Sequence, residues 1–172
     1  FISGFNSAVT FQWSERLGGT GTDLGKSIAV NSSNNIIVTG DVVGNADLNG
    51  DADTADTNED GAGVYGNSDV FISAFNSVGT FQWSERLGGP ANDYGSDVAV
   101  DSSNNIIVTG LINGNADLNG DADTADSNEN NGGVYADTDA FISVFNSAGT
   151  FQWSKRLGGT SIDYGEGVST DS

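Results

Sequence analysis

The sequence predicts an all-β fold made of tandem four-stranded antiparallel repeats, and three observations support this prediction. The chain of 172 residues repeats itself at a constant offset of 70 residues, without insertion or deletion. Short segments alternate apolar and polar residues and are separated by Gly, Asn, Asp and Ser, which is typical of strands and turns. No segment shows apolar residues at helical spacing together with capping residues, so we expect no helix.

Three matching segments define the repeat. They are FISGFNSAVTFQWSERLGG from Phe1, FISAFNSVGTFQWSERLGG from Phe71 and FISVFNSAGTFQWSKRLGG from Phe141. The chain therefore divides into repeat 1 at residues 1–70, repeat 2 at residues 71–140 and a partial repeat 3 at residues 141–172.

Four strands follow one another within a copy, as the second copy shows. The segment FISAF, residues 71–75, alternates in character, and a turn at NSVG leads into TFQWSERL, residues 80–87. After a glycine-rich break come SDVAV, residues 96–100, the turn DSSNN and the strand IIVTGLI, residues 106–112. Apolar residues occupy both faces of these strands, which indicates sheets that stack face against face.

Four antiparallel strands per tandem copy predict propeller-type blades, with an open β-solenoid or fibre and a stack of small sandwiches as alternatives. The repeat is longer than the usual blade of about 40–50 residues. Its excess length lies between the VTG strand and the next FIS strand. A closed propeller needs about 4–8 blades, and this chain holds fewer than two and a half repeats. We therefore expect it to be a segment of a longer array or part of an assembly.

The ordered motifs resemble the bacterial beta-propeller repeat family known as SBBP. The resemblance depends on LGGTGTDLGKSIAVNSSNNIIVTG from Leu17 and on DVFISAFNSVGTFQWSERLGG from Asp69. It implies propeller blades in a large secreted or surface-bound bacterial protein, in a family mostly without an assigned activity. The Asp- and Asn-rich insert of this chain departs from the common pattern of the family.

Composition excludes several classes of function. The formal net charge is −19, from 24 acidic and 5 basic residues, which argues against nucleic acid and anionic membranes and favours cations. Cysteine and histidine are absent, which removes disulfides, thiolate metal sites and the usual general base. No apolar run is long enough to cross a membrane, and we expect no membrane insertion. No nucleophile with an activating base stands out, so we expect no enzyme.

The insert carries the main functional candidate, the stretch NADLNGDADTAD, which occurs twice without change. Aligned to the calcium loop of the EF-hand, it places oxygen ligands at alternating positions and a glycine at the sixth. The predicted ligands are Asn45, Asp47, Asn49, Asp51, Asp53 and Asp56 in the first copy, and Asn115, Asp117, Asn119, Asp121, Asp123 and Asp126 in the second. Without flanking helices, the loop resembles those of thrombospondin type 3 repeats and of integrin alpha-subunit propellers.

A bound cation would explain why so many carboxylates are crowded together, because Ca²⁺ prefers six to eight oxygen ligands. The alternative is a solvated acidic loop that keeps the protein soluble. A second, poorer loop could start at Asp56, but its copy has Asn131 where the glycine is needed. We do not expect that second loop to bind calcium.

Three further positions recur in every copy: an Asp two residues before a glycine, a Trp, and an Arg three residues after that Trp. They are Asp23, Asp93 and Asp163; Trp13, Trp83 and Trp153; and Arg16, Arg86 and Arg156. We interpret the Asp as a turn residue that accepts the N–H two residues on, in preference to a sialidase-type Asp-box. We expect the Trp to pack in or between blades rather than to stack sugars, and the Arg to form ion pairs.

The sequence thus predicts a non-catalytic, calcium-binding repeat protein, secreted or on a bacterial cell surface, with a structural or adhesive role. Self-association, into a fibre for example, or continuation into further repeats would extend the array. The main alternative is a ligand-binding propeller that recognises glycans or proteins. A glycosidase-like propeller would need catalytic residues outside this segment.

Overall fold

The computed structural model describes residues 1–59, 61, 64–127, 129 and 138–171. Within this described part the chain forms twelve strands and no helix, so it offers no helix that could cross a membrane. The predicted all-β class is confirmed. The strands carry β-branched and aromatic residues between turns of Asn, Ser and Gly, which is why they adopt extended backbone.

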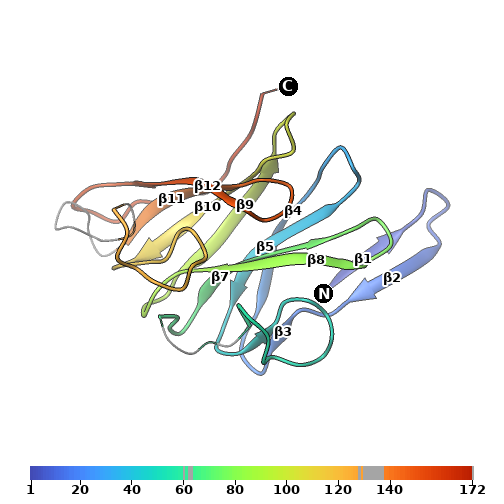
Figure 1. Cartoon of the computed structure of the whole chain (residues 1–172), viewed down its shortest axis with the longest axis horizontal. Helices are drawn as coiled ribbons and strands as arrows, with labels where there is room; N and C mark the ends of the chain where they lie inside the picture. Colours follow the sequence, from blue (N-terminus) through green and yellow to red (C-terminus); the bar gives the residue numbers. More distant parts are fainter. Residues whose placement is uncertain (60, 62–63, 128, 130–137, 172) are drawn as a thin grey trace.

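Two four-stranded antiparallel sheets make up most of the molecule (Figure 1). The first contains β4 (Leu24–Val30), β5 (Ile36–Val42), β7 (Asp69–Phe75) and β8 (Phe81–Leu87), in that spatial order. The second contains β9 (Tyr94–Val100), β10 (Ile106–Asn113), β11 (Thr138–Phe145) and β12 (Phe151–Leu157). Within each four-stranded sheet the strands pair in chain order, with only the short β6 lying between β5 and β7 in the sequence, as predicted for a blade.

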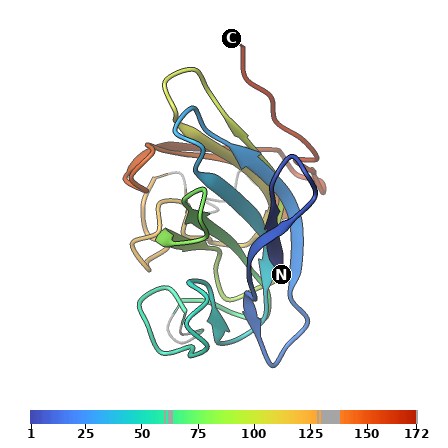
Figure 2. The ribbon, with the colours of Figure 1, turned by 90° about the vertical axis from the view of Figure 1, so that its right-hand side faces the viewer.

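Smaller elements complete the fold. The hairpin of β1 (Ile2–Phe5) and β2 (Phe11–Glu15) is equivalent to the last two strands of a blade, which are β7 and β8 in the first complete sheet. The short strand β3 (Gly18–Gly19) pairs with β6 (Ala46–Asp47), which lies in the insert between β5 and β7. The sheets fan out side by side and do not close into a ring (Figure 2).

The sheets and the sequence repeats differ in phase. The first complete sheet begins at Leu24, and the boundary between residues 70 and 71 lies inside β7. The boundary between residues 140 and 141 likewise lies inside β11. The first complete sheet therefore takes β4 and β5 from repeat 1, and β8 and most of β7 from repeat 2.

The main hydrophobic core fills the space between the two complete sheets. Ile37, Ile72 and Leu87 of the first sheet meet Val98 and Val108 of the second, and all five are buried. A second core joins the first hairpin to the rear face of the first sheet. Burial between the sheets, at about 25 cal/mol for each Å² of apolar surface, is the main source of stability.

A tryptophan forms the joint between neighbouring blades. Trp83 of β8 packs on Phe145 of β11 at 6.4 Å between ring centroids. Its indole N–H donates to the carbonyl oxygen of Ser147 at 3.1 Å. Trp13 makes the equivalent contacts with Phe75 and Ser77. The packing therefore supports the expected structural role of Trp13 and Trp83 between blades.

Candidate metal sites in the acidic inserts

Each acidic insert follows the second strand of a blade and returns to the third. The first insert, residues 43–68, joins β5 to β7, and the second, residues 114–137, joins β10 to β11. Because β5 pairs directly with β7, the described part of the first insert is displaced to one end of the sheet, where it curls into a loop (Figure 1). The described part of the second insert, residues 114–127, lies at the same end of its own sheet.

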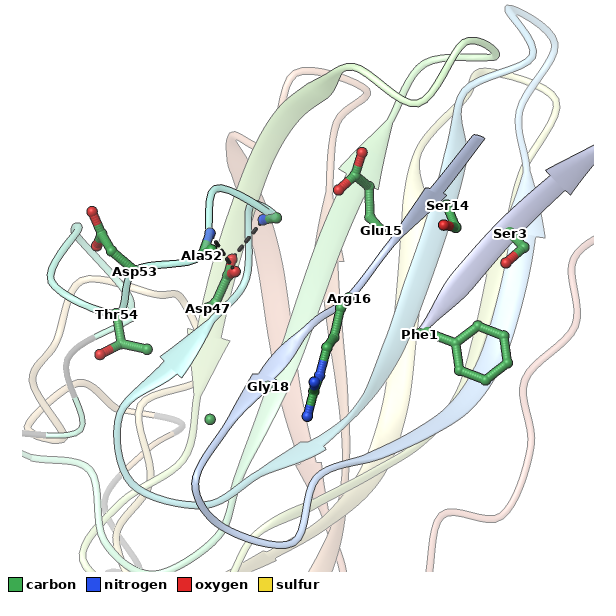
Figure 3. Close-up of a pocket in the computed structure, with 12 residues that line it drawn as sticks. Phe1, Ser3, Ser14, Glu15, Arg16, Gly18, Asp47, Ala52, Asp53 and Thr54 are labelled. Carbon is green, nitrogen blue, oxygen red and sulfur yellow. Dashed lines mark hydrogen bonds between the residues drawn. The ribbon is translucent and has the colours of Figure 1, made fainter. Parts of the chain in front are cut away.

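A buried aspartate shapes the backbone of each loop. The Asp47 carboxylate accepts the backbone N–H of Asn49 at 3.1 Å, of Gly50 at 2.5 Å and of Ala52 at 2.9 Å, as the dashed lines in Figure 3 show in part. Asp117 does the same in the second insert, at 2.7 to 2.9 Å. These aspartates were predicted as metal ligands, but the structure directs them at the backbone of the loop.

Alternating side chains then curl the loop further. The Asn49 side-chain oxygen accepts the N–H of Asp51 at 2.8 Å, and Asp51 accepts the N–H of Asp53 at 3.0 Å. Gly50 and Ala52 adopt positive φ values of 86° and 72°, which lets successive side chains turn to the same side. The regular spacing of the sequence thus becomes a series of Asx turns.

Three carboxylates converge inside each loop. Asp51, Asp53 and Glu59 bring one oxygen each within 4.8 Å of the others. Asp121, Asp123 and Glu129 repeat the cluster in the second insert. Four of the twelve predicted ligands are therefore brought together, and each pair is joined by a glutamate that the sequence reasoning missed.

Glu59 supplies a second, independent sign of a ligand. Its side chain is 1% exposed, and one oxygen accepts the N–H of Leu48 at 2.9 Å. The other oxygen is buried and has no hydrogen-bond partner. Glu129 repeats both features. A buried carboxylate oxygen without a partner is costly, and a cation among the three carboxylates would satisfy it.

Burial raises the pKa of both glutamates. Desolvation is the largest cause for Glu59, and the neighbouring charges of Asp47 and Asp51 act in the same direction. For Glu129, desolvation raises the pKa to about 7, with Asp117 contributing. The raised pKa of each glutamate reflects the cost of a buried negative charge, and a divalent cation beside the carboxylate would offset that cost.

The other predicted ligands bind within the loop. The Asn45 side-chain oxygen accepts the N–H of Gly61 at 3.1 Å. Asn49 donates its amide to Asp56 at 3.0 Å, and Asn119 donates to Asp126 at 3.1 Å. Asn115 also takes part in an interaction. Asn45, Asn49 and Asn119 therefore form hydrogen bonds within the inserts, whereas a role of these residues in metal binding stays a prediction.

The EF-hand template does not mark the missed glutamates. When it is counted from Asp47 instead of Asn45, its closing position falls on Asn58, one residue before Glu59. In the poorer second loop, Asp60, Asn128, Asn130 and Asn131 lie outside the described residues. Asn58 of that loop points its amide to the carbonyl oxygen of Ser84 on β8, at 3.0 Å.

A buried arginine fastens each insert to the sheet. The Arg86 guanidinium pairs with Asp69 at 2.8 Å, with both side chains 0% exposed, and donates to the Gly44 carbonyl at 2.7 Å. The Tyr65 ring lies 5.0 Å above it. Arg156 pairs with Asp139 in the second blade. The predicted ion pairs are confirmed for these two arginines, whereas Arg16 is exposed.

Tyr65 also joins one insert to the next. Its hydroxyl group bonds the Arg86 carbonyl at 2.9 Å and the Asp117 carboxylate at 3.2 Å. Glu85 of β8 approaches Gly120 of the second insert, and burial raises its pKa to about 7, with Asp117 adding to the effect. Buried hydrogen bonds of Tyr65 therefore connect the first insert to the second across the two blades.

The recurring aspartate before glycine is structural, but its partners differ from those predicted. Asp93 is fully buried and accepts the N–H of Gly89, four residues upstream, and of Asn113, each at 2.7 Å. Asp23 bonds Gly19 and Val43 in the same way. The expected bond to the N–H two residues on is wrong, because the carboxylate instead connects the turn to the start of the insert. Burial raises the pKa of Asp93 to about 7.

Three hollows lie beside the inserts. The largest, about 610 Å³, is lined by Glu15, Arg16, Asp47 and Asp53 among others (Figure 3). The two smaller hollows occupy equivalent places in the two blades, with about 340 Å³ beside Glu59 and about 290 Å³ beside Glu129. Each of these combines carboxylate and amide groups of the insert with an aromatic ring of β8 or β12.

Comparisons with known proteins agree with this architecture. Residues 82–118 match the SBBP model, a beta-propeller repeat. The chain is also similar to the uncharacterized WD repeat-containing protein L264 of Acanthamoeba polyphaga mimivirus, with 26% identity over 182 residues. That alignment covers 98% of this chain but only 13% of the viral protein. The four-stranded antiparallel sheets agree with this match, in which residues 82–118, from β8 into the second insert, are similar to a beta-propeller repeat of the SBBP family.

Proposed function

We propose that this chain is a non-catalytic, calcium-stabilised array of propeller-type blades with a structural or adhesive role outside a bacterial cell. The observation that carries the proposal is the convergence of Asp51, Asp53 and the buried, partly unsatisfied Glu59 in one loop. The same arrangement recurs in the second insert. Both copies leave the same buried glutamate oxygen without a hydrogen-bond partner, so a cation that binds one insert would also bind the other.

Electrostatics favour a divalent cation. Two unit charges at 4.8 Å repel by about 1 kcal/mol in water and about 3 kcal/mol near a protein surface. Calcium suits the donor set because it prefers carboxylate oxygens and tolerates irregular geometry. In this proposal Asp51, Asp53 and Glu59 hold the ion, while Asp47 keeps the loop curled around it.

The proposed extracellular location sets the expected affinity. Calcium sites of extracellular modules bind with dissociation constants of about 10⁻⁴ to 10⁻³ M. Each ion would stabilise its insert. Because Arg86 of β8 contacts Gly44 and Tyr65 of the first insert, the ion would also stabilise the attachment of that insert to the blade. Strong negative charge argues against nucleic acid as a partner. Further repeats of the same chain, or other copies of it, are the partners that a blade of this kind would meet.

Calcium titration tests the proposal. We expect about two ions per chain by calorimetry, one for each cluster, and a melting temperature that rises with calcium and falls with EDTA. Replacing both Glu59→Gln and Glu129→Gln should abolish the response. Glu166→Gln, which removes one charge from an exposed position, is the matched control and should keep it. An unchanged melting temperature with EDTA, or an unchanged response in the double variant, would refute calcium binding.

A ligand-binding role is the second candidate, and the repeated hollows beside Glu59 and Glu129 favour it. Carboxylate and amide groups next to an aromatic ring are suited to sugars or to peptide groups. Phe81 and Trp83 contribute the ring side of the first hollow. Binding of the chain to glycans on an array, lost in the variant Phe81→Ala, would support this role. An absence of binding at saturating calcium would reject glycans as ligands.

A further inference from the structure

One tyrosine of the first insert reaches the aspartate that shapes the second insert. The Tyr65 hydroxyl lies 2.9 Å from the carbonyl oxygen of Arg86 and 3.2 Å from Oδ2 of Asp117. Tyr65 is buried, and burial raises its pKa, with the charge of Asp117 acting in the same direction. The hydroxyl group therefore keeps its proton at physiological pH and can donate it to the Asp117 carboxylate.

Asp117 uses the same carboxylate to fix the loop that carries its own metal cluster. Oδ1 accepts the N–H of Asn119 at 2.9 Å and of Gly120 at 2.7 Å, and Oδ2 accepts the N–H of Ala122 at 2.7 Å. Asp121, one of the three clustered carboxylates, lies between Gly120 and Ala122 in the chain. A shift of Asp117 would therefore move the backbone on both sides of a candidate ligand.

The other end of this connection lies in the first cluster. The Tyr65 ring lies 5.0 Å from the Arg86 guanidinium. Nη1 of Arg86 donates to the Gly44 carbonyl oxygen at 2.7 Å and to the Glu59 carbonyl oxygen at 3.4 Å. Glu59 is the buried glutamate whose second side-chain oxygen has no hydrogen-bond partner. One guanidinium group therefore contacts both the backbone of a candidate ligand and the ring of Tyr65.

A second contact joins the inserts, but its electrostatic sign is opposite. Asn58 donates to Glu85 at 3.3 Å, and an oxygen of Glu85 lies against the backbone of Gly120. Burial raises the pKa of Glu85 to about 7, and the charge of Asp117 adds to the effect. Glu85 thus repels the carboxylate that the Tyr65 hydroxyl attracts, so an attractive connection between the inserts depends on Tyr65.

We propose that the Tyr65 hydroxyl couples the two calcium sites, so that calcium in one insert raises the affinity of the other. The inference rests on the proposed calcium binding. Tyr65 is a positioning residue in this role, because it acts through Asp117 and Arg86 rather than on an ion.

The coupling arises because the inserts share the cost of becoming ordered. An ion in the first insert fixes the segment of Glu59, and with it Arg86 and Tyr65, in the position from which the hydroxyl bonds Asp117. The second loop then loses less conformational entropy when it closes around its own ion. Because binding free energies are linked, an ion in the second insert favours binding in the first to the same extent.

NMR titration of the full chain with calcium tests the proposal, because the amides of Gly50 and Gly120 report one insert each. Both N–H groups are donated to the aspartate of their own loop. Glu59→Gln removes the first site, and we expect it to raise the calcium concentration at the Gly120 midpoint about fivefold or more. In a Tyr65→Phe background the same substitution should shift that midpoint by about twofold or less. Tyr164→Phe, which removes an exposed hydroxyl, is the matched control background and should keep the full shift.

This double-mutant cycle separates coupling from stability. A purely structural role of Tyr65 would lower the melting temperature in EDTA without changing the ratio of the midpoints. An unchanged Gly120 midpoint in Glu59→Gln, or an equal shift in the parent and Tyr65→Phe backgrounds, would overturn the coupling while leaving calcium binding intact. The absence of any calcium-dependent change at Gly50 and Gly120 would instead refute calcium binding, and the coupling with it.

The parent chain alone provides a second measurement that does not depend on how the variants fold. Its calorimetric calcium isotherm should be steeper than that of two independent sites. An isotherm of two independent sites would overturn the coupling, although the number of bound ions would still support the proposed function.

Discussion

Replacing Arg86 with methionine removes the positive partner of a buried ion pair while keeping much of the side-chain volume. The guanidinium lies 2.8 Å from Asp69, and both side chains are 0% exposed. It also holds the first insert through the Gly44 carbonyl and lies under the Tyr65 ring. The substitution therefore leaves a carboxylate buried without its partner and loosens the insert at once.

The magnitude follows from this geometry. At 2.8 Å and an effective dielectric constant of about 20, the attraction is about 6 kcal/mol, which desolvation of both groups offsets in part. Removing one partner of a buried pair costs about 3–5 kcal/mol, and loss of the bond to Gly44 adds about 1 kcal/mol. We expect Arg86→Met to lower the free energy of unfolding by about 4–6 kcal/mol.

Urea denaturation followed by circular dichroism measures the effect. Arg16→Met is the matched control, since Arg16 occupies the equivalent place in the first hairpin but is exposed, and it should cost about 0.5 kcal/mol or less. The double variant Asp69→Leu with Arg86→Met should recover most of the loss, because no buried charge then remains. A loss below about 1 kcal/mol for Arg86→Met, or no recovery in the double variant, would refute the reasoning.

Two further predictions concern the polar links around the inserts. Tyr65→Phe removes the hydroxyl that bonds Arg86 and Asp117. Urea denaturation should show a loss of about 1–2 kcal/mol in the free energy of unfolding. An unchanged free energy of unfolding would mean that this hydroxyl does not stabilise the fold. Burial raises the pKa of Asp93 from 3.8 to about 7 in the folded state, so the folded chain binds more protons than the unfolded chain between these values. Stability in calcium-free buffer should therefore fall as pH rises from about 4 to about 7. Asp93→Asn should flatten this slope, and an equal slope in the variant would contradict the assignment.

Local pattern was sufficient for much of the fold. Alternation in 71–75 and 106–112 and the turn residues between strands predicted the sheets, because side-chain periodicity and turn chemistry are local properties. The recurrence of Arg86 and Arg156 among few basic residues predicted the ion pairs. The exact offset of 70 residues implied that every blade would repeat the same contacts.

The parts that sequence did not predict depend on packing between distant segments. Glu59 joins the carboxylate cluster because the loop folds back until Leu48 can donate to it, and a linear ligand template does not contain that contact. Tyr65 reaches Asp117 only because two blades lie side by side. Asp93 bonds Asn113, twenty residues away, whereas a turn rule considers only its immediate neighbours.

The boundary between repeats inside β7 has a consequence for how such a gene changes length. Exchange between two misaligned DNA copies would add or delete 70 codons at a time, and the strand at the crossover would be rebuilt from two halves of nearly the same sequence. Each joint between repeats in the new protein would therefore have nearly the same sequence as a joint that already exists in the chain.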